Sequence, residues 1–259
     1  MIDLTGKRAL VTGGSKGIGL AIAGELLQLG ASVATCSRHD DELEAAAAKL
    51  RAGGGTVHAR AADVTDPRQV EDLVAGAAEA LGGLDVLVNN AGRAHPGTFG
   101  RLTDEDWQAD LDMKLFSMIR CSRAAVPHML EAGGGRIVNV NAVYGRYPDP
   151  TFFATSVNRA ACQSFTKTLA IELAPSGILV NSVNIGFVAT PQWKNIHEQR
   201  APELSEEEFF GGFAAAEVPL GRFGRPDEVS GVVAFLASDR ASYITGASID
   251  VAGGMGRYV

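Results

Sequence analysis

Short apolar runs alternate with longer amphipathic stretches along most of this chain. The apolar runs are rich in β-branched residues and predict strands, at residues 8–12, 32–36, 56–60, 84–89, 136–141, 179–184 and 247–251. Stretches with helical spacing predict helices, at residues 18–29, 40–50, 67–81, 104–130, 153–174 and 226–237. Strands that alternate with helices favour a parallel sheet covered on both faces. The pattern therefore predicts an α/β fold of the doubly wound Rossmann type, with a seven-stranded sheet and a single domain over residues 1–259.

Residues 190–219 break this alternation, between the sixth predicted strand and the last predicted helix. They combine many acidic residues with aromatic residues such as Trp193, Phe209 and Phe213. This composition favours two short amphipathic helices with solvated outer faces. The position also suits a substrate lid, because open α/β sheets bind ligands at the carboxyl ends of their strands. The two interpretations are compatible, and both stay open.

The first predicted strand runs into a glycine-rich turn that opens the first predicted helix, Thr12-Gly13-Gly14-Ser15-Lys16-Gly17-Ile18-Gly19. Gly13 allows a tight turn, and Gly17 and Gly19 let the backbone approach a ligand closely. The helix that follows points its unsatisfied N–H groups and the positive end of its dipole at the turn. A glycine-rich turn between a strand and a helix therefore predicts a dinucleotide site with the pyrophosphate at the helix N-terminus.

The order and spacing of several motifs resemble the short-chain dehydrogenase/reductase family over essentially the whole chain. The turn has the spacing T-G-x-x-x-G-x-G, and Asn89-Asn90-Ala91-Gly92 matches the family's signature after the fourth strand. Ala62-Asp63-Val64 matches the family's adenine contact, and residues 180–186 with Thr190 resemble the segment that closes over the nicotinamide. The resemblance implies a single NAD(P)-binding Rossmann domain. The implied cofactor-binding residues are Gly13, Ser15, Lys16, Gly17, Ile18, Gly19, Ser37, Arg38, Asp63, Val64, Asn90, Ala91, Gly92, Arg159, Gly186, Val188 and Thr190.

The end of the second predicted strand indicates which nicotinamide cofactor is bound. An NAD site places a carboxylate there to accept hydrogen bonds from the ribose hydroxyls. This chain has Cys36-Ser37-Arg38 instead, without an acid. The Arg38 guanidinium can bind a 2′-phosphate through two hydrogen bonds, Ser37 can donate another, and Lys16 supplies a second positive charge. The sequence therefore predicts NADP(H), although both cations could also be solvated surface charges.

The resemblance also implies four catalytic side chains, Asn, Ser, Tyr and Lys, but this sequence differs from the family pattern at all four. Lys114 takes the asparagine position and Ala142 the serine position. Thr155 takes the tyrosine position and Arg159 the lysine position. A methyl group cannot hydrogen-bond a substrate oxygen, and a threonine hydroxyl is much less acidic than a phenol. Arg159 can hold ribose hydroxyls but does not relay a proton, so the usual mechanism is not expected.

Several side chains could supply the missing acid. A desolvated Lys114 could donate a proton or form a Schiff base; alternatively it is a surface lysine, or it pairs with Asp110 or Asp112. Tyr144 and Tyr147 lie in the loop after the fifth predicted strand and could bring a phenol to a carbonyl group. Further candidates in this region are His95 beside the expected nicotinamide and a set of cations that would attract a carboxylate or phosphate, Arg93, Arg146 and Arg159.

Three functions are compatible with these residues. The first is an NADP(H)-binding oxidoreductase that acts on a small carbonyl or alcohol substrate with a non-standard proton donor. Its expected catalytic residues are Lys114, Tyr144, Tyr147, Thr155 and Arg159. The second is a non-redox enzyme, such as a lyase, a dehydratase or an aldol-type enzyme, that keeps the dinucleotide as a structural group. The third is a catalytically silent NADP(H)-binding subunit, because a fold does not imply a function.

Composition narrows the range of partners. The formal net charge of −7 and the isoelectric point near 5.3 argue against nucleic acid and anionic membranes. Cys36, Cys121 and Cys162 are scattered in apolar surroundings and are expected to be reduced, buried thiols. No metal site is predicted. The chain begins without a signal-peptide pattern and contains no apolar window of membrane-spanning length, so we expect a cytoplasmic protein. The family resemblance implies a homotetramer or homodimer.

Overall fold

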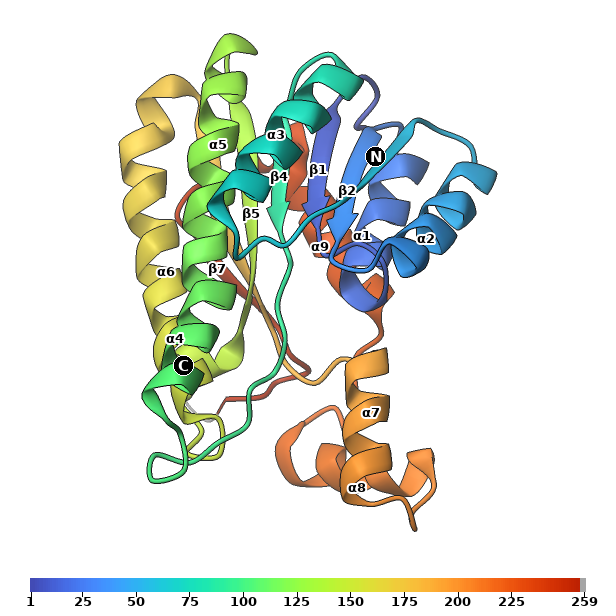
Figure 1. The fold of residues 1–259 in the computed structure, drawn as a ribbon, viewed down its shortest axis with the longest axis vertical. Coiled ribbons are helices and arrows are strands. Elements are labelled where there is room, and N and C mark those ends of the chain that lie inside the picture. Colours follow the sequence, from blue (N-terminus) through green and yellow to red (C-terminus); the bar gives the residue numbers. More distant parts are fainter. Residues whose placement is uncertain (257–259) are drawn as a thin grey trace.

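The computed structural model describes residues 1–256, except for the side chains of residues 199 and 200. Residues 257–259, which the predicted domain includes, lie outside this part. The centre of the molecule is a seven-stranded parallel sheet with the order β3-β2-β1-β4-β5-β6-β7 (Figure 1). The strands are β1 (Arg8–Thr12), β2 (Ser32–Ser37), β3 (Val57–Ala61), β4 (Val86–Asn89), β5 (Gly135–Ala142), β6 (Ile178–Ile185) and β7 (Ser248–Val251).

Helices cover both faces of the sheet, as expected for strands joined by helical crossovers (Figure 1). One face carries α1 (Gly17–Gln28), α2 (Asp40–Ala52) and α9 (Pro226–Ala237). The other face carries α3 (Pro67–Leu81), α5 (Ser117–Glu131) and α6 (Phe153–Leu173). The predicted doubly wound fold is confirmed.

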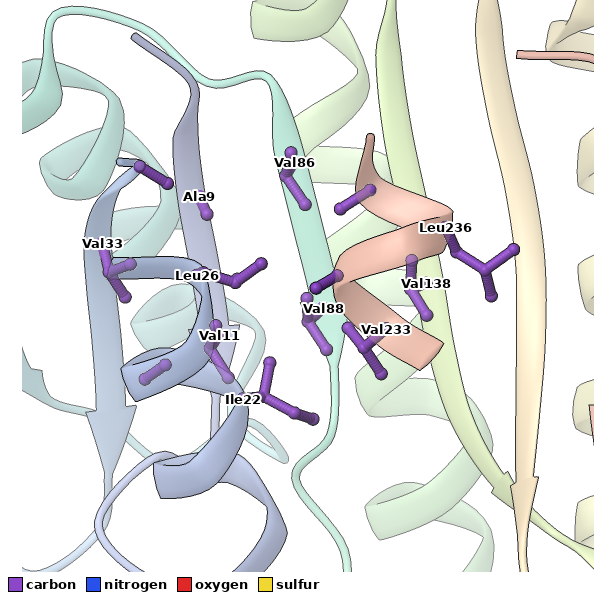
Figure 2. Close-up of a cluster of buried hydrophobic side chains, with 14 of the residues drawn as sticks. Ala9, Val11, Ile22, Leu26, Val33, Val86, Val88, Val138, Val233 and Leu236 are labelled. Atoms are coloured by element: carbon purple, nitrogen blue, oxygen red, sulfur yellow. The ribbon is translucent and has the colours of Figure 1, made fainter. Parts of the chain in front are cut away.

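The interior explains why the strands read as continuous apolar runs. Val11 of β1 and Val88 of β4 are fully buried against Ile22 and Leu26 of α1 and Val233 of α9 (Figure 2). A second cluster fills the opposite face, beneath α3, α5 and α6. Because both faces of each central strand are covered, polar residues are tolerated there only with partners. The Asn89 amide, for example, donates to Ser122 Oγ and to Asn139 Oδ1.

The long helix predicted over residues 104–130 is not one regular helix. It consists of α4 (Asp104–Leu111), a π-helical turn at Asp112–Phe116 and then α5. The wider turn contains an additional residue and brings Met113 and Lys114 to the buried side together. The hydroxyl of Ser117 donates to the carbonyl of Met113 at 2.6 Å, which satisfies one carbonyl that the wider turn frees. Sequence periodicity missed this interruption because the apolar pattern continues through it.

Residues 190–219 form the two short helices that their composition predicted, α7 (Pro191–Arg200) and α8 (Glu206–Glu217), which project beyond the carboxyl ends of the strands (Figure 1). Their aromatic residues make a small core of their own. Trp193 packs edge-on against Phe187 at 4.9 Å between ring centroids and against Phe213 at 5.7 Å. The role of this segment as a lid stays a prediction. In the described part of the chain, no helix is both long and apolar enough to cross a bilayer.

Candidate active site

A cavity of about 360 Å³ lies at the carboxyl ends of the strands. Its floor is the point at which the strand order reverses, between β1 and β4, where open α/β sheets bind ligands. The glycine-rich turn follows β1 and Asn90-Ala91-Gly92 follows β4, and both line the cavity. Lys114 and Thr155 line the same cavity. Segments far apart in the sequence thus meet at one site.

The glycine-rich turn has the geometry that its residues predicted. Gly13 has φ of +71° and Gly17 has φ of +57°, a region that favours glycine. A Cβ at Gly19 would lie 2.2 Å from the carbonyl oxygen of Gly13 and 2.4 Å from Asn90 Nδ2. The Asn90 amide in turn donates to the carbonyls of Thr12 and Gly13 at 2.9 and 3.1 Å. The turn is therefore fixed by direct backbone contacts, and the first turn of α1 faces the cavity.

The side of the cavity next to β2 lacks an acid at the end of that strand, where Ser37 and Arg38 line the wall. Lys16 lines the same region, but its ammonium forms an exposed ion pair with Glu42 at 2.9 Å. Lys16 is thus already partly neutralised by a carboxylate. The Arg38 guanidinium is the stronger candidate for a phosphate contact.

Lys114 is buried, which rules out the surface lysine that the sequence left open. Only 1% of its side chain is exposed, and its ammonium contacts the Asp110 carboxylate directly. The ammonium also donates to Thr155 Oγ1 at 3.0 Å. Asp110 and Thr155 thus engage two of the three N–H groups of Lys114, which also lines the cavity. Lys114 therefore pairs with Asp110, one of the alternatives that the sequence offered, and at the same time lines the cavity.

Opposing effects act on the charge of Lys114. Burial, together with the positive charge of Arg159, lowers the pKa of Lys114 below its ordinary value. A negative charge on Asp110, in direct contact, would favour the ammonium form and act in the opposite direction. Asn158 donates to Asp110 Oδ2 at 2.9 Å and holds that carboxylate in place. Lys114 and Asp110 thus form a buried pair in which burial and Arg159 favour the neutral amine and a charged Asp110 favours the ammonium.

Arg159 lies on α6, one helical turn after Thr155, and 91% of it is buried. Its Nη1 donates to the carbonyl of Val140 at 3.0 Å, and its Nη2 approaches Gly92. Its Nε–H has no hydrogen-bond partner within the described residues. Desolvation lowers the pKa of Arg159 from its ordinary value. A buried cation with an unpaired donor at the wall of a cavity is suited to hold the polar groups of a ligand.

The two candidate tyrosines have different surroundings. Tyr144 lines the cavity and stacks on Phe152, and burial raises the pKa of its phenol well above the usual range. A phenol that holds its proton so tightly is a weak acid at neutral pH. Tyr147 packs instead against Gly256 in the small aromatic core and is not among the described residues that line the cavity.

The remaining polar candidates are also spread over different places. Arg93 lines the cavity, whereas Arg146 lies 3.5 Å from Asp250 Oδ2 in an ion pair. The Asp63 carboxylate accepts hydrogen bonds from the backbone N–H and the hydroxyl of Thr65. Its sequence neighbours Ala62 and Val64 line the cavity, whereas Asp63 itself does not. The other residues named from sequence, Ser15, Ile18, Val64, Ala142, Gly186, Val188 and Thr190, all line the cavity.

Two residues of the site were not found by sequence reasoning. Asn158, which orients Asp110, lies on α6, three residues after Thr155, and no spacing signal marks it. Gln192 of α7 accepts a hydrogen bond from the backbone N–H of Ala94 at 2.9 Å and connects the α7 segment to the loop after β4. Asp110 had been noted only as one possible partner of Lys114. The four-residue spacing of the two on a helix was the available signal.

Residues 13–256 match the family model described as enoyl-(acyl carrier protein) reductase. The chain belongs to the short-chain dehydrogenase/reductase family. One curated relative, a 3-oxoacyl-(acyl-carrier-protein) reductase from Thermotoga maritima, is 36% identical over 97% of this chain and 98% of its own length. The family resemblance inferred from the motifs is therefore confirmed over nearly the full length.

Solved short-chain dehydrogenase/reductases have the same fold. The NADPH-bound structure of a short-chain oxidoreductase from Pseudomonas aeruginosa PAO1, described as containing an atypical catalytic center, is 38% identical over all of both chains, with a TM-score of 0.93. L-sorbose reductase from Gluconobacter frateurii, solved with NADPH and L-sorbose, is 33% identical over all of this chain and 99% of its own, with a TM-score of 0.95. Both relatives were determined with the cofactor that Arg38 and Ser37 predicted for this chain.

Proposed function

We propose that this protein is an NADP(H)-dependent oxidoreductase that interconverts a carbonyl compound and an alcohol, with Lys114 as the proton donor. The observation that carries the proposal is the position of the Lys114 ammonium, which is buried, bonded to Asp110 and Thr155, and part of the wall of the dinucleotide cavity. The NADPH in the solved relatives supports the cofactor. The atypical catalytic center of the Pseudomonas aeruginosa relative supports departure from the usual residues.

The residues of the cavity fit a dinucleotide. The close packing of Gly19 against Gly13 leaves no room for a side chain, so the backbone of the turn stays open to a pyrophosphate. Arg38 and Ser37 would hold a 2′-phosphate, and the guanidinium of Arg159 would meet the ribose next to the nicotinamide. When bound, NADPH supplies the hydride.

Lys114 would complete the reduction from the side of the protein. Its third N–H would donate to the carbonyl oxygen of the substrate, and the ammonium would give up this proton as negative charge develops on that oxygen. Thr155 Oγ1 and Asp110 fix the direction of the ammonium. Ala142 lines the cavity with a methyl group in place of a hydroxyl, which would leave Lys114 as the principal donor to the substrate oxygen. Apolar cavity residues such as Phe187, Trp193 and Met255 favour a substrate with an apolar portion.

The direct test combines the purified protein with NADPH and a panel of carbonyl compounds, followed by the loss of nicotinamide absorbance. The panel contains an acetoacetyl thioester of N-acetylcysteamine, L-sorbose and acetophenone, which represent an acyl thioester, a sugar and an apolar ketone. Oxidation of NADPH together with formation of the corresponding alcohol would support the proposal. Tight NADPH binding without turnover of any carbonyl compound would favour a silent subunit instead.

The reduction is expected to fail at alkaline pH, because only the ammonium form of Lys114 carries a proton to donate. Burial and the positive charge of Arg159 lower the pKa of Lys114, so activity should be lost at a pH below the ordinary titration range of lysine. A negative charge on Asp110 opposes this shift of the pKa. Substitution Asp110→Asn removes the carboxylate that favours the ammonium and should move the alkaline limb of kcat/KM to lower pH. A limb that stays in place or moves to higher pH would contradict this assignment.

Loss of the Tyr144 phenol should leave the chemistry almost intact. Burial keeps its proton tightly bound, so Tyr144→Phe should change kcat by less than about threefold, far below the effect of removing a general acid. The ring still stacks on Phe152 in this variant. A loss of kcat of about 100-fold or more would instead identify Tyr144 as the acid.

The cofactor preference should depend on Arg38. Substitution Arg38→Asp removes a charge-assisted contact worth about 1.5–3 kcal/mol and places a carboxylate near the 2′-phosphate. The Kd for NADPH, measured by nicotinamide fluorescence, should therefore rise about 10- to 100-fold or more, while NADH binding improves. Arg101→Asp, an equal charge change at an exposed position before α4, is the matched control. Unchanged discrimination between NADPH and NADH would exclude Arg38 from the phosphate site.

A specific observation also favours a second, non-redox function. A buried lysine that loses its proton readily is the nucleophile of Schiff-base enzymes, and burial and Arg159 both promote this loss in Lys114. Reduction of mixtures of the protein and a carbonyl compound with borohydride would trap such an adduct as a stable mass increase on Lys114. Trapping, with consumption of substrate and no change in nicotinamide absorbance, would favour a lyase or aldol-type enzyme.

A further inference from the structure

A chain of polar side chains connects Lys114 to the surface of the protein. Asp110 Oδ1, which contacts the Lys114 ammonium, also lies 3.7 Å from Nδ1 of His95. The other ring nitrogen of His95, Nε2, lies 3.4 Å from Asp106 Oδ1. Asp106 and Asp110 are one helical turn apart on α4, and His95 belongs to the connection from β4 to α4, which extends beyond the sheet before α4 begins (Figure 1). His95 is therefore placed between the two carboxylates.

Exposure increases step by step along this chain. The side chains of Lys114 and Asp110 are each 1% exposed. The His95 side chain is 23% exposed and that of Asp106 is 39% exposed. An acid that donates a proton in every turnover must take one back from water, and only 1% of the Lys114 side chain is exposed. The imidazole ring, which has two nitrogens that can exchange roles as donor and acceptor, is suited to bridge the interior and the solvent.

Groups on neighbouring elements hold this chain in place and define its charge. Asn158 of α6 donates to the second oxygen of Asp110, and Thr155 Oγ1 lies 3.4 Å from the backbone carbonyl of His95. On the cavity side of Lys114 the neighbouring charges are the cations Arg159 and Arg93. Cys162 of α6 contacts the Lys114 backbone carbonyl. Carboxylates thus lie on the side of His95 and cations on the side of the cavity, which favours proton entry from His95.

We propose that His95 transfers protons between solvent and Lys114, with Asp110 on its inner side and Asp106 on its outer side. The proposal rests on the proposed function, because only a Lys114 that gives up its proton needs to be reloaded. His95, protonated at Nδ1, first takes a second proton at Nε2 from water beside Asp106. The resulting imidazolium releases its Nδ1 proton to Asp110, and Asp110 passes one proton to the neutral Lys114 amine. Exchange with water then returns His95 from the Nε2–H form to the Nδ1–H form. The net result is one proton moved from solvent to Lys114, with no change of redox state in the protein.

The exchange of the Lys114 Nζ–H protons with water tests this route without any substrate. Protein labelled with 15N-lysine reports that exchange by NMR, and the signal that disappears in Lys114→Met identifies the residue. His95→Gln keeps the volume and polarity of the side chain but removes the two-nitrogen route, so exchange should slow by about tenfold or more. His95→Ala should also slow it, and added imidazole should restore the rate. Exchange at the wild-type rate in His95→Gln would overturn the proposal.

A kinetic experiment connects the route to turnover and separates the two proposals. With the carbonyl compound from the panel that is reduced best, His95→Gln should complete its first turnover at the normal rate and then slow. The reaction is started at a pH below the alkaline limb of kcat/KM, where Lys114 carries its proton. His128→Gln, which changes a histidine 4.0 Å from Glu131 in the last turn of α5, is the matched control. Continued fast turnover in His95→Gln, with an inactive Lys114→Met, would refute only the proton route. An active Lys114→Met would refute the proposed function itself.

Discussion

Substitution Lys114→Met is expected to lower kcat for NADPH-dependent carbonyl reduction by about 100- to 10,000-fold, the range for loss of a positioned general acid. Methionine has nearly the length of lysine but has no proton to give, so the variant keeps the shape of the cavity wall. NADPH affinity should be unchanged, because the glycine-rich turn, Arg38 and Arg159 stay in place. Single-turnover absorbance measurements at saturating NADPH separate the chemical step from cofactor binding.

The main complication of this variant is the carboxylate that it leaves behind. Asp110 would be buried without its cation, and removal of one partner of a buried ion pair costs about 3–5 kcal/mol. The double variant Lys114→Met/Asp110→Asn removes both charges and should recover much of that stability while it remains inactive. Unfolding by urea checks the stability, and circular dichroism checks the fold. Reduction at the wild-type rate in a folded Lys114→Met protein would refute the role of Lys114.

Substitution Gly19→Ala is expected to abolish tight cofactor binding. The added Cβ would lie 2.2 Å from the carbonyl oxygen of Gly13 and 2.4 Å from Asn90 Nδ2, and backbone cannot move aside as a flexible side chain can. Overpacking of this kind costs about 1–3 kcal/mol and displaces the turn. The Kd for NADPH should rise about 10- to 100-fold or more, measured by nicotinamide fluorescence.

A second glycine in the same helix provides the control. A Cβ at Gly24 would meet only Leu50 Cδ2, at an ordinary 3.7 Å, so Gly24→Ala should leave the Kd unchanged. It should also raise the free energy of unfolding by about 0.5–1 kcal/mol, because alanine loses less conformational freedom in a helix. Equal NADPH affinity in Gly19→Ala and wild-type protein would show that the turn tolerates the displacement or that the cofactor binds elsewhere.

The site was only partly predictable from the sequence. Some of its features depend on residues that are neighbours along the chain, whereas others depend on contacts between residues far apart in the sequence. The turn after β1 was found from Gly13, Gly17 and Gly19, since positive φ and close packing are local requirements that a sequence displays directly. The sequence left Lys114 open between a catalytic lysine in the pocket and one that is solvated or paired with Asp110 or Asp112. Helical spacing places Lys114 and Asp110 side by side, but it does not reveal which face of α4 is covered.

The sequence alone determined the α/β fold, the seven parallel strands and the dinucleotide turn, because hydrophobic periodicity and glycine placement reflect local backbone geometry and the need to bury both faces of the sheet. The tertiary structure decided the rest. The π-helical turn directs Lys114 inward, and packing of α6 against α4 brings Thr155 and Asn158 to the pair. The long connection after β4 adds His95. These contacts join residues 15 to 48 positions apart, and no local pattern encodes such distances.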